Sequence, residues 1–514
     1  MLVYILRRLV AAFFILIGAS FIVYILLTYA GDPLEFTRGI TNPTQRAAAQ
    51  RSVTEALNLD TPRVWRYVLW LKDLIFSLDA RERFGNSART NLPVWDDLTG
   101  RMLMTLKLVS AATFASIFIG VSVGIVSALR QYSGFDYLVT FVTFVFFSVP
   151  VFWVAVILKS WGGINFNDWL RDGAHFSVEF IALAAVLAAV IGYSIAGGRW
   201  PRKAVFGVAA AAGIVALLAW MSSVKWMLNP GLGPIVFALL ALAIAVGVTV
   251  VMAGWRNAKA RNSALTAAVV GIALYFPIQG VLDGDLNVWK LLGLGVVAVL
   301  VGVAIGYAWG GYDKGQSART AAIVAVLCSV VAFVDRAMQS WAEYSASSVI
   351  RNRPIKTIGD RESRLEGSFW VITDNTLSHL ILPTMALMLI SLASYTRYSR
   401  ASMLEVLNQD YIRTARAKGL TERTVVVRHG FRNAMIPLAT IVAFDVGGIL
   451  GGAVVTETVF EWNAMGSMFI DGLRNQDPNP VMAFFVVIAT FAIVFNLIAD
   501  IVYAVLDPRI RIGA

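Results

Sequence analysis

The sequence predicts an all-α, polytopic membrane protein, and three observations carry this prediction. Of the 514 residues, 58% are hydrophobic and only 15% are charged, whereas a soluble domain carries about 25% charged residues. The mean hydropathy is +0.70. Many apolar runs are close to the length of a helix that crosses a bilayer, and a closed β-barrel would show short alternating segments instead.

The first apolar run, 9–29, is long enough to span a membrane. No small-x-small cleavage pattern precedes Gly31, so we expect an uncleaved first span rather than a signal peptide. A polar stretch, 31–100, follows and contains an amphipathic segment, 56–74, which is predicted to be helical. Spans at 102–129 and 138–161 complete an N-terminal part, residues 1–161.

The middle of the chain, 162–370, is unusual because it holds six further apolar runs. They are rich in Ala, Gly and Val, which allow helices to pack closely in lipid. The runs are 177–196, 204–221, 233–254, 263–282, 288–310 and 319–338. The C-terminal part, 371–514, adds three spans, at 379–399, 436–460 and 481–506. Twelve spans are therefore predicted, although one pair of the middle runs could be re-entrant.

The net charge of +11 predicts membrane topology rather than nucleic-acid binding, because Lys and Arg accumulate in cytoplasmic loops. With Arg7 and Arg8 in the cytoplasm, alternating spans put every basic short loop on the cytoplasmic side and the acidic ones outside. The basic loops are those at Arg130, 197–204, 255–262 and 312–320, together with segment 409–437, and the acidic ones are 283–287 and 457–480. This pattern predicts that both termini are cytoplasmic.

Several kinds of site are not expected in this chain. The single cysteine, Cys328, excludes an intrachain disulfide framework and a Cys-based metal cluster. No His, Cys or carboxylate cluster has metal-ligand spacing, and the sequence contains no P-loop. We find no nucleophile–base arrangement either, so the sequence predicts neither catalytic residues nor a metal site.

Segment 409–437 carries six Arg or Lys residues between two spans. Strong helix formers precede Gly419, which is typical of a helix end, and Thr421 is a candidate N-cap for a second helix. Pro437 suits the start of the following span. The segment is therefore predicted to be a rigid cytoplasmic helix–Gly–helix projection, which either binds anionic lipid headgroups or contacts a protein.

The stretch "ASMLEVLNQDYIRTARAKGLTERTVVVRHGFRNAMIPLATIV", 401–442, resembles the signature loop of binding-protein-dependent ABC transporter permeases. Within them it resembles the dipeptide/oligopeptide/nickel group. Further motifs agree in order along the chain, and the resemblance covers about 1–160 and 371–514. They are "ILRRL" at 5–9, "GDP" at 31–33, "FSVPVFW" at 147–153, "HLILPTMAL" at 379–387, "GGAVVTETVF" at 451–460 and "LDPRIR" at 506–511.

The resemblance implies a type I importer permease core of about six membrane-spanning helices, to which the middle region adds about six. It implies a prokaryotic plasma (inner) membrane protein that forms half of a pathway for dipeptides or oligopeptides. The implied partners are a second homologous permease, two cytoplasmic ATPases that hold ATP and Mg, an extracytoplasmic peptide-binding protein and membrane lipid, with no nucleic acid. No cofactor is expected in this chain.

The resemblance also assigns roles to residues. The loop 400–436 would couple the permease to the ATPases through a docking helix at 410–419, where small Ala415 lets a partner approach and Gly419 allows the turn. Cationic side chains there would pair with acidic groups on the ATPase. The coupling residues so implied are Asp410, Arg413, Ala415, Arg416, Lys418 and Gly419. Asp445, inside a span, is a candidate pathway residue, or is capped by a neighbouring helix or the second permease.

The chain departs from the family pattern in three places. Arg413-Thr414-Ala415 stands where the generic motif begins Glu-Ala-Ala, and Asn463–Gly466 replaces an expected Pro-Gly-x-Gly. The insert, 162–370, is absent from usual members and is either a lipid-facing accessory bundle, a docking surface for another membrane protein or a regulatory element. Alternatives to a peptide permease are an ABC permease for nickel chelates or glutathione, an ion-coupled secondary transporter, or a membrane-embedded enzyme.

Overall fold

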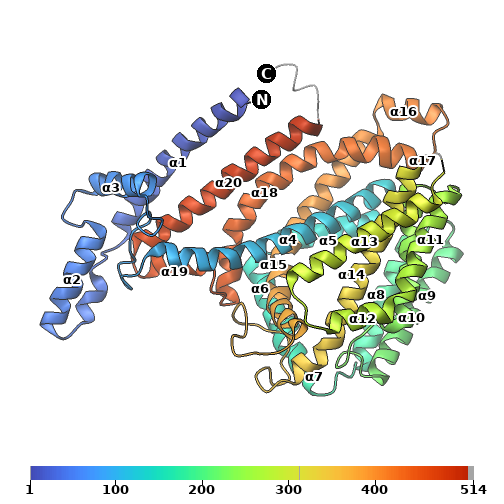
Figure 1. The fold of residues 1–514 in the computed structure, drawn as a ribbon, viewed down its shortest axis with the longest axis horizontal. Coiled ribbons are helices and arrows are strands. Elements are labelled where there is room, and N and C mark those ends of the chain that lie inside the picture. Colours follow the sequence, from blue (N-terminus) through green and yellow to red (C-terminus); the bar gives the residue numbers. More distant parts are fainter. Residues whose placement is uncertain (1, 312, 507–514) are drawn as a thin grey trace.

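The computed structural model describes residues 2–311 and 313–506, which form helices and loops with one isolated bridge between Asn86 and Pro93 (Figure 1). Nine helices in these residues are long and apolar enough to cross a membrane, and three bent helix pairs raise the number to twelve if each is one span. The predicted all-α, multi-pass architecture is confirmed. The predicted terminal motif at 506–511 falls almost entirely outside the described residues.

The N-terminal part begins with a long helix and ends with a sharply bent pair. Its helices are α1 (Leu2–Ala30), α2 (Pro43–Leu57), α3 (Arg63–Phe76), α4 (Val94–Leu129), α5 (Gly134–Ser148), α6 (Val151–Ile157) and α7 (Phe166–Arg171). The amphipathic segment predicted at 56–74 is divided, because Asn58 adopts a left-handed conformation (φ 51°) that ends α2. Pro62 then directly precedes α3.

The span predicted at 138–161 is not straight. The helices on the two sides of Pro150 make an angle of 100°, since proline lacks the N–H that would continue the helical hydrogen bonds. Beyond α6, residues Leu158–Asn165 wind as a π-helix into α7. The chain therefore turns here instead of crossing the bundle along one axis.

Each of the six runs predicted in the insert is helical. The helices are α8 (Val178–Ile195), α9 (Trp200–Ser223), α10 (Gly233–Met252), α11 (Ala258–Ala273), α12 (Tyr275–Asp283), α13 (Val288–Trp309) and α14 (Lys314–Ala346). The run at 263–282 is bent by 53° between α11 and α12. The small residues expected to allow close packing do so: a Cβ on Gly306 would lie 2.2 Å from the Cα of Ala318.

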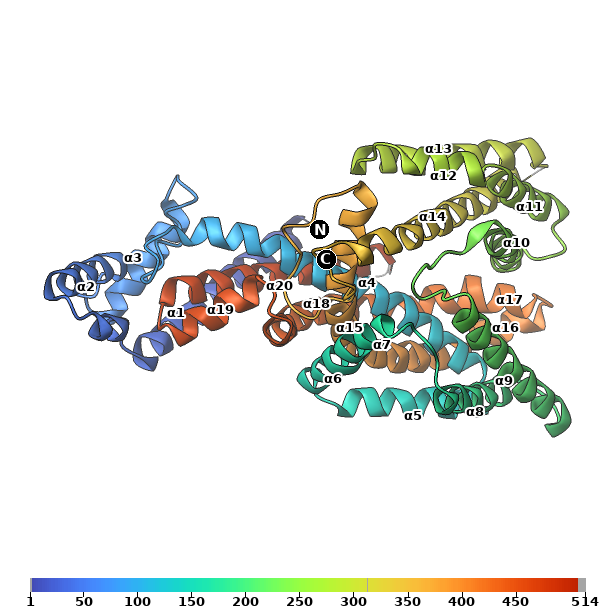
Figure 2. The ribbon, with the colours of Figure 1, turned by 90° about the horizontal axis from the view of Figure 1, so that it is seen from below.

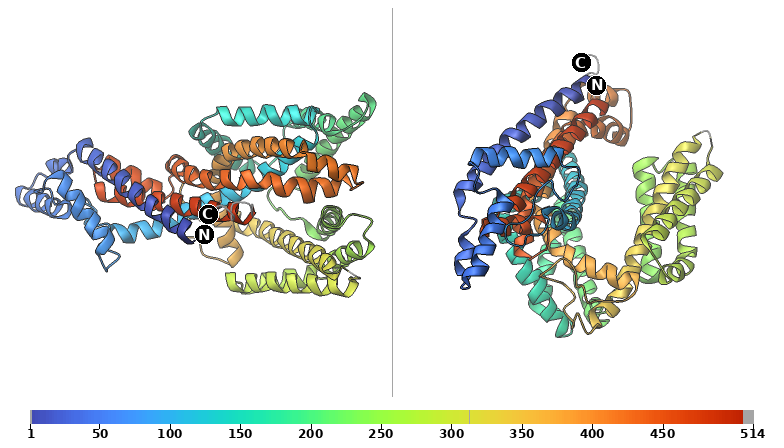
Figure 3. Two further views of the ribbon diagram at one scale, coloured as in Figure 1. Left: turned by 90° about the horizontal axis from the view of Figure 1, so that it is seen from above. Right: turned by 60° about the vertical axis from the view of Figure 1, so that its left-hand side comes forward.

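The insert is not one bundle. The hairpin α8–α9 packs on α5, whereas α10–α14 form a separate bundle that meets the core through α14 and the C-terminal part's first helix, α15 (Phe369–Leu407). Figures 2 and 3 show these two bodies as separate arms on one side of the molecule. One amide joins the two ends of the insert: Asn167 Nδ2 donates to Ile355 O (2.7 Å) and Ile355 N donates to Asn167 Oδ1 (3.0 Å).

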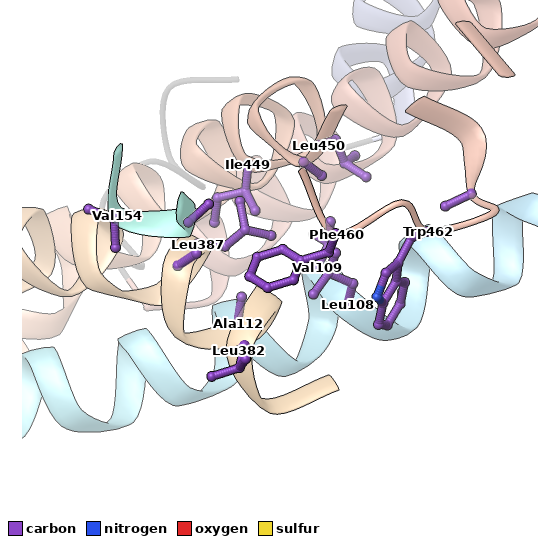
Figure 4. Close-up of a cluster of buried hydrophobic side chains, with 14 of the residues drawn as sticks. Leu108, Val109, Ala112, Val154, Leu382, Leu387, Ile449, Leu450, Phe460 and Trp462 are labelled. Carbon is purple, nitrogen blue, oxygen red and sulfur yellow. The ribbon is translucent and has the colours of Figure 1, made fainter. Parts of the chain in front are cut away.

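The C-terminal part continues after α15 with a short exposed helix and two long helices. These elements are α16 (Asp410–Ala417), α17 (Glu422–Thr424), α18 (Arg432–Val459), α19 (Met465–Arg474) and α20 (Pro478–Leu506). Helix α15 packs closely on α4 at a Gly-x-x-x-Gly pair, where a Cβ on Gly124 would lie 1.9 Å from Ser399 Oγ. Figure 4 shows the core between these helices and α18, a buried cluster that includes Leu108, Leu382, Ile449 and Phe460.

The short basic loops meet at one end of the molecule, where α16 also lies (Figure 1). Arg130 Nη1 donates to Ile195 O (2.6 Å), Gln316 Nε2 to Met252 O (3.2 Å), and Arg423 Nε to Val251 O (3.0 Å). The acidic loop after α12 lies at the opposite end, beside the start of α15, since Trp370 Nε1 donates to Leu282 O (2.6 Å). The basic short loops named here therefore lie at the end that carries α16, and the acidic loop 283–287 lies at the other end.

The candidate coupling segment and pathway residues

Helix α16 and its end have the predicted layout. Gly419 takes a left-handed conformation (φ 74°), and its N–H donates to Arg416 O (2.9 Å), which closes the helix. Thr421 then caps α17, because its Oγ1 accepts from the N–H of Thr424 (3.4 Å). The predicted helix–Gly–helix projection is therefore present.

One face of α16 is turned inward. The side chains of Ile412, Ala415 and Val425 form a small buried cluster, in which Ile412 and Val425 are fully buried. Ala415 therefore lies against its own segment and does not present its side chain outward, in contrast to the expectation that a partner approaches it. Its small size serves close packing between α16 and the π-helical residues Val425–Phe431.

The other face of α16 is charged and exposed. Asp410, Arg413 and Lys418 are exposed, and the Arg413–Asp410 pair is long (3.6 Å), so it contributes little to stability. Arg416 differs, because its guanidinium donates to both carboxylate oxygens of Glu422 (3.1 and 2.7 Å). Such a bidentate pair fixes the turn between α16 and α17, so Arg416 already has a partner within the chain.

Pro437 does not begin the next span, as the sequence predicted, but lies inside α18. The π-helical turn Val425–Phe431 continues directly into α18, so no loop separates the coupling segment from this span. Helical backbone therefore continues from α17 into α18, whereas the turn at Gly419 separates α16 from α17.

Asp445 lies in α18 with one carboxylate oxygen, Oδ2, buried and without a hydrogen-bond donor among the described residues. The side chain of Tyr395 on α15 lies beside this carboxylate. A buried carboxylate oxygen and a tyrosine hydroxyl are thus brought together between α15 and α18. Buried polar groups normally have partners, so this place suits water, substrate or a second subunit.

An ion pair that sequence reasoning missed joins α5 to α15. Asp136 is 2% exposed and accepts from Arg400 Nε (2.7 Å) and Nη2 (2.8 Å), and from Ser127 Oγ (2.5 Å). Ser133 caps α5 with its side chain on the N–H of Asp136. The Ser-x-x-Asp spacing marks a helix start, but no sequence signal points to Arg400, far along the chain.

A second missed group is Glu457. It was expected in the outer acidic loop 457–480, but it is fully buried in the last turn of α18. Its carboxylate accepts from Thr105 Oγ1 (2.7 Å) on α4 and from the N–H of Gly466 (2.6 Å) at the start of α19. A Cβ on Gly466 would lie 2.4 Å from that carboxylate, so glycine is needed where the family pattern also ends in Gly.

Arg423 connects the coupling segment to the insert. Arg423 donates through Nε to Val251 O (3.0 Å) in the last turn of α10, and its Nη2 donates to the same carbonyl. A guanidinium suits the carbonyl end of a helix. Gly254, with φ 82°, leaves room for it, because a Cβ there would lie 2.7 Å from Arg423 Nη1.

This architecture defines a polytopic helical membrane protein, and a short exposed helix, α16, is joined to one of its spans through the turn at Gly419 and α17. The described residues contain no group of three or more His, Cys, Asp or Glu that could hold a metal ion. The candidate sites are the exposed charged face of α16 and the polar side chains of Asp445 and Tyr395 between α15 and α18.

Comparison with known protein families identifies the class of membrane protein to which the chain belongs. The family described as "Binding-protein-dependent transport system inner membrane component" matches residues 120–512, and its N-terminal component matches residues 1–109. The chain therefore belongs to this family of transport permeases. The resemblance to peptide-type ABC permeases is confirmed by the relatives.

Three relatives illustrate the similarity. The oligopeptide transport system permease protein OppB of Mycobacterium tuberculosis is 37% identical over 228 residues, which are 44% of this chain and 70% of that protein. The dipeptide permease DppB of Escherichia coli is 47% identical over 137 residues, 27% of this chain and 40% of that protein. DppB of Alkalihalophilus pseudofirmus is 25% identical over 512 residues, 99% and 100% of the two chains.

Proposed function

We propose that this chain is the permease subunit of an ATP-driven importer of dipeptides or oligopeptides, and that it forms half of the translocation pathway beside a second, homologous permease. The names of its relatives support the substrate class. The observation that carries the proposal is α16: a short helix, held from inside by Ile412, Ala415 and Val425, that presents a charged outer face and is joined by one tight turn to the helical backbone of a span.

Of the two cytoplasmic ATPases, one would dock on α16 and the other on the second permease, and they would hold the ATP and Mg that this chain has no P-loop to bind. Asp410, Arg413 and Lys418 would meet the ATPase, where exposed charge pairs set orientation more than affinity. Ala415 and Gly419 would shape the helix, and Arg416 would hold its turn through Glu422. Closure of the ATPases would then move α18 through the continuous backbone.

The remaining partners follow from the same arrangement. An extracytoplasmic peptide-binding protein would deliver peptide to the end opposite α16, and most of the selectivity would lie in that protein. The chain would lie in the prokaryotic inner membrane with both termini cytoplasmic, because the basic loops gather at the α16 end. Asp445, beside Tyr395, would line the pathway and meet the amino terminus of a peptide.

A pair of substitutions at Gly419 tests this function. Gly419→Val places a β-branched side chain in a left-handed conformation, which is strained, whereas Asn tolerates that conformation. Gly419→Val should abolish co-purification of the ATPases and peptide-stimulated ATP hydrolysis, while Gly419→Asn keeps both. Peptide uptake that persists without any ATPase and collapses with the proton gradient would instead indicate an ion-coupled transporter.

A further inference from the structure

Helix α3, in the polar stretch after the first span, has an unpartnered apolar face. One of its faces is buried, with Tyr67 and Trp70 packed among α1 and α20. The opposite face is exposed although it is apolar, and the exposed fractions of Trp65 and Phe76 reach 62% and 73%. The exposed apolar side chains of α3 are Val64, Trp65, Val68, Ile75 and Phe76, and Leu78 follows the helix.

The position of α3 along α1 shows its depth. The hydroxyl of Tyr67 donates to Ile17 O (2.9 Å) and lies 2.9 Å from Ser20 Oγ. Arg7 and Arg8 belong outside the hydrocarbon, so the span of α1 lies beyond them, and a hydrocarbon core of about 30 Å takes about 20 residues. Ile17 and Ser20 therefore lie near the middle of the membrane-crossing length of α1. Tyr24, whose ring lies 6.0 Å from that of Trp70, belongs to the half distant from the arginines.

Helix α20 gives the same depth independently. Met482 and Ala483 share one buried cluster with Tyr24, Tyr67 and Trp70. Because α20 begins at Pro478, α3 lies one to two turns inside the start of this apolar helix. Both spans thus place α3 in the half of the membrane opposite α16 (Figure 1), and its contact with the start of α20 lies at the boundary between headgroups and acyl chains.

The remaining side chains of α3 fit such a boundary. Arg66 and Asp73 lie on a third, polar arc; Arg66 Nε donates to Thr61 O (2.6 Å), at the end of α3 that leads back to α2. The guanidinium of Arg63 stacks on the ring of Tyr29 (4.2 Å) near the end of α1. Lys72 is the one cation among the exposed apolar residues, and a lysine there buries its stem and extends its ammonium to the headgroups.

We propose that α3 is an interfacial membrane anchor, whose exposed face inserts into the acyl–headgroup boundary of the lipid leaflet opposite the α16 end. An amphipathic helix with Trp and Phe on its apolar face lies in that plane with its apolar side inserted about 5–10 Å. The polar segment 31–100 would thereby be held flat against the bilayer beside α1 and α20. This surface is additional to the coupling and pathway surfaces and does not depend on the transported substrate.

Spin labels test the anchor in the assembled transporter reconstituted into phosphatidylethanolamine/phosphatidylglycerol vesicles. The single cysteine, Cys328, allows a Cys328→Ala background, into which Trp65→Cys and Phe76→Cys are introduced, with Asp73→Cys on the polar arc as the matched control. Collision rates with oxygen, which partitions into lipid, and with a water-soluble nickel chelate report what surrounds each label. Retained peptide-stimulated ATP hydrolysis shows that each variant is folded.

We expect labels at 65 and 76 to collide several-fold more with oxygen and several-fold less with the nickel chelate than the label at 73. Equal nickel accessibility at all three sites would place α3 in water and overturn the proposal. Low accessibility to both reagents at 65 and 76 would show that a protein partner covers the face and would equally overturn it. If Trp65→Cys fails to assemble, Ile75→Cys on the same face replaces it with the same expectation.

Discussion

Arg400 holds Asp136 with two charge-assisted hydrogen bonds, 2.7 and 2.8 Å long, and thereby fixes the start of α5 to α15 less than three turns before the coupling segment. The Asp136 side chain is 3% exposed and that of Arg400 is 29% exposed. The pair therefore ties α5 to the part of α15 that leads into α16.

Replacing Asp136 by Ala leaves the guanidinium of Arg400 without its counter-charge. Removing one member of a buried pair costs about 3–5 kcal/mol, so Asp136→Ala should markedly lower the thermal midpoint of the purified transporter. The double variant Asp136→Leu/Arg400→Met should recover much of the loss, since it leaves no charge unpaired. A double variant as unstable as the single one would show that the pair acts through something other than charge.

The α4–α15 contact depends on Gly124. A Cβ there would meet Ser399 Oγ at 1.9 Å and the backbone carbonyl of Thr396 at 2.5 Å, so Gly124→Ala must separate the helices at a cost of about 1–3 kcal/mol. Gly100→Ala in the same helix is the control, because no atom lies within 4 Å of a Cβ there. Thermal unfolding should show a loss for Gly124→Ala only; equal midpoints would contradict this packing.

Arg423 links the coupling segment to the insert. Arg423→Ala removes a cation from the carbonyl end of α10, an interaction of about 0.3–1 kcal/mol, and should speed amide hydrogen exchange at residues 251–257. Arg428→Ala, also basic and exposed in the same segment, should leave that exchange unchanged. A matching change in both variants would mean that net charge, rather than this contact, governs the end of α10.

Asp477 ties the long outer segment to the start of α20. Its carboxylate accepts from Ser87 Oγ (2.7 Å) and from the N–H of Ala88 (2.8 Å), and burial raises its pKa above the usual range. Between the unfolded and folded pKa values the folded protein keeps a proton that the unfolded chain has lost. The stabilisation from this group is therefore fully present below about pH 4 and is lost as the pH rises through the folded pKa.

Asp477→Asn removes this titration. The thermal midpoint of the variant should fall less than that of the original protein as the pH rises from about 4 to about 6. Asp471→Asn, at an exposed position on α19, is the control and should follow the original protein. A variant with an undiminished pH dependence would place the titrating group elsewhere.

The length of the hydrophobic runs predicted the positions of the membrane-spanning helices well. An apolar segment in lipid forms a helix because the helix satisfies the hydrogen bonds of its own backbone. The end of α16 at Gly419 could also be predicted from the sequence, because the left-handed conformation that ends a helix favours glycine. What the sequence does not contain is the pairing between distant segments. Neither the Asp136–Arg400 pair nor the contact of Arg423 with Val251 has a local signal, and the division of the insert into two bodies arises from which helices pack together.

Predictions from the local sequence were wrong where contacts with distant segments determine the environment of a residue. The sequence predicts that Glu457 is an acidic residue of an outer loop. In the structure it is buried, because Thr105 and the start of α19 donate hydrogen bonds to its carboxylate. Ala415 reads as a docking residue, but the inner face of α16 needs a small side chain there. The sequence predicts that Pro437 begins a helix, but the π-helical turn before it keeps the preceding backbone helical.

The central claim is that the outer face of α16 meets a cytoplasmic ATPase. Photocrosslinking thiol reagents at Arg413→Cys and Lys418→Cys, each in a Cys328→Ala background, test it in the assembled transporter, with Ala415→Cys on the inner face as the control. The account predicts crosslinks to the ATPase from 413 and 418 and none from 415. An intact, active complex with no ATPase crosslink from either outer position, or with crosslinks to lipid alone, would contradict it.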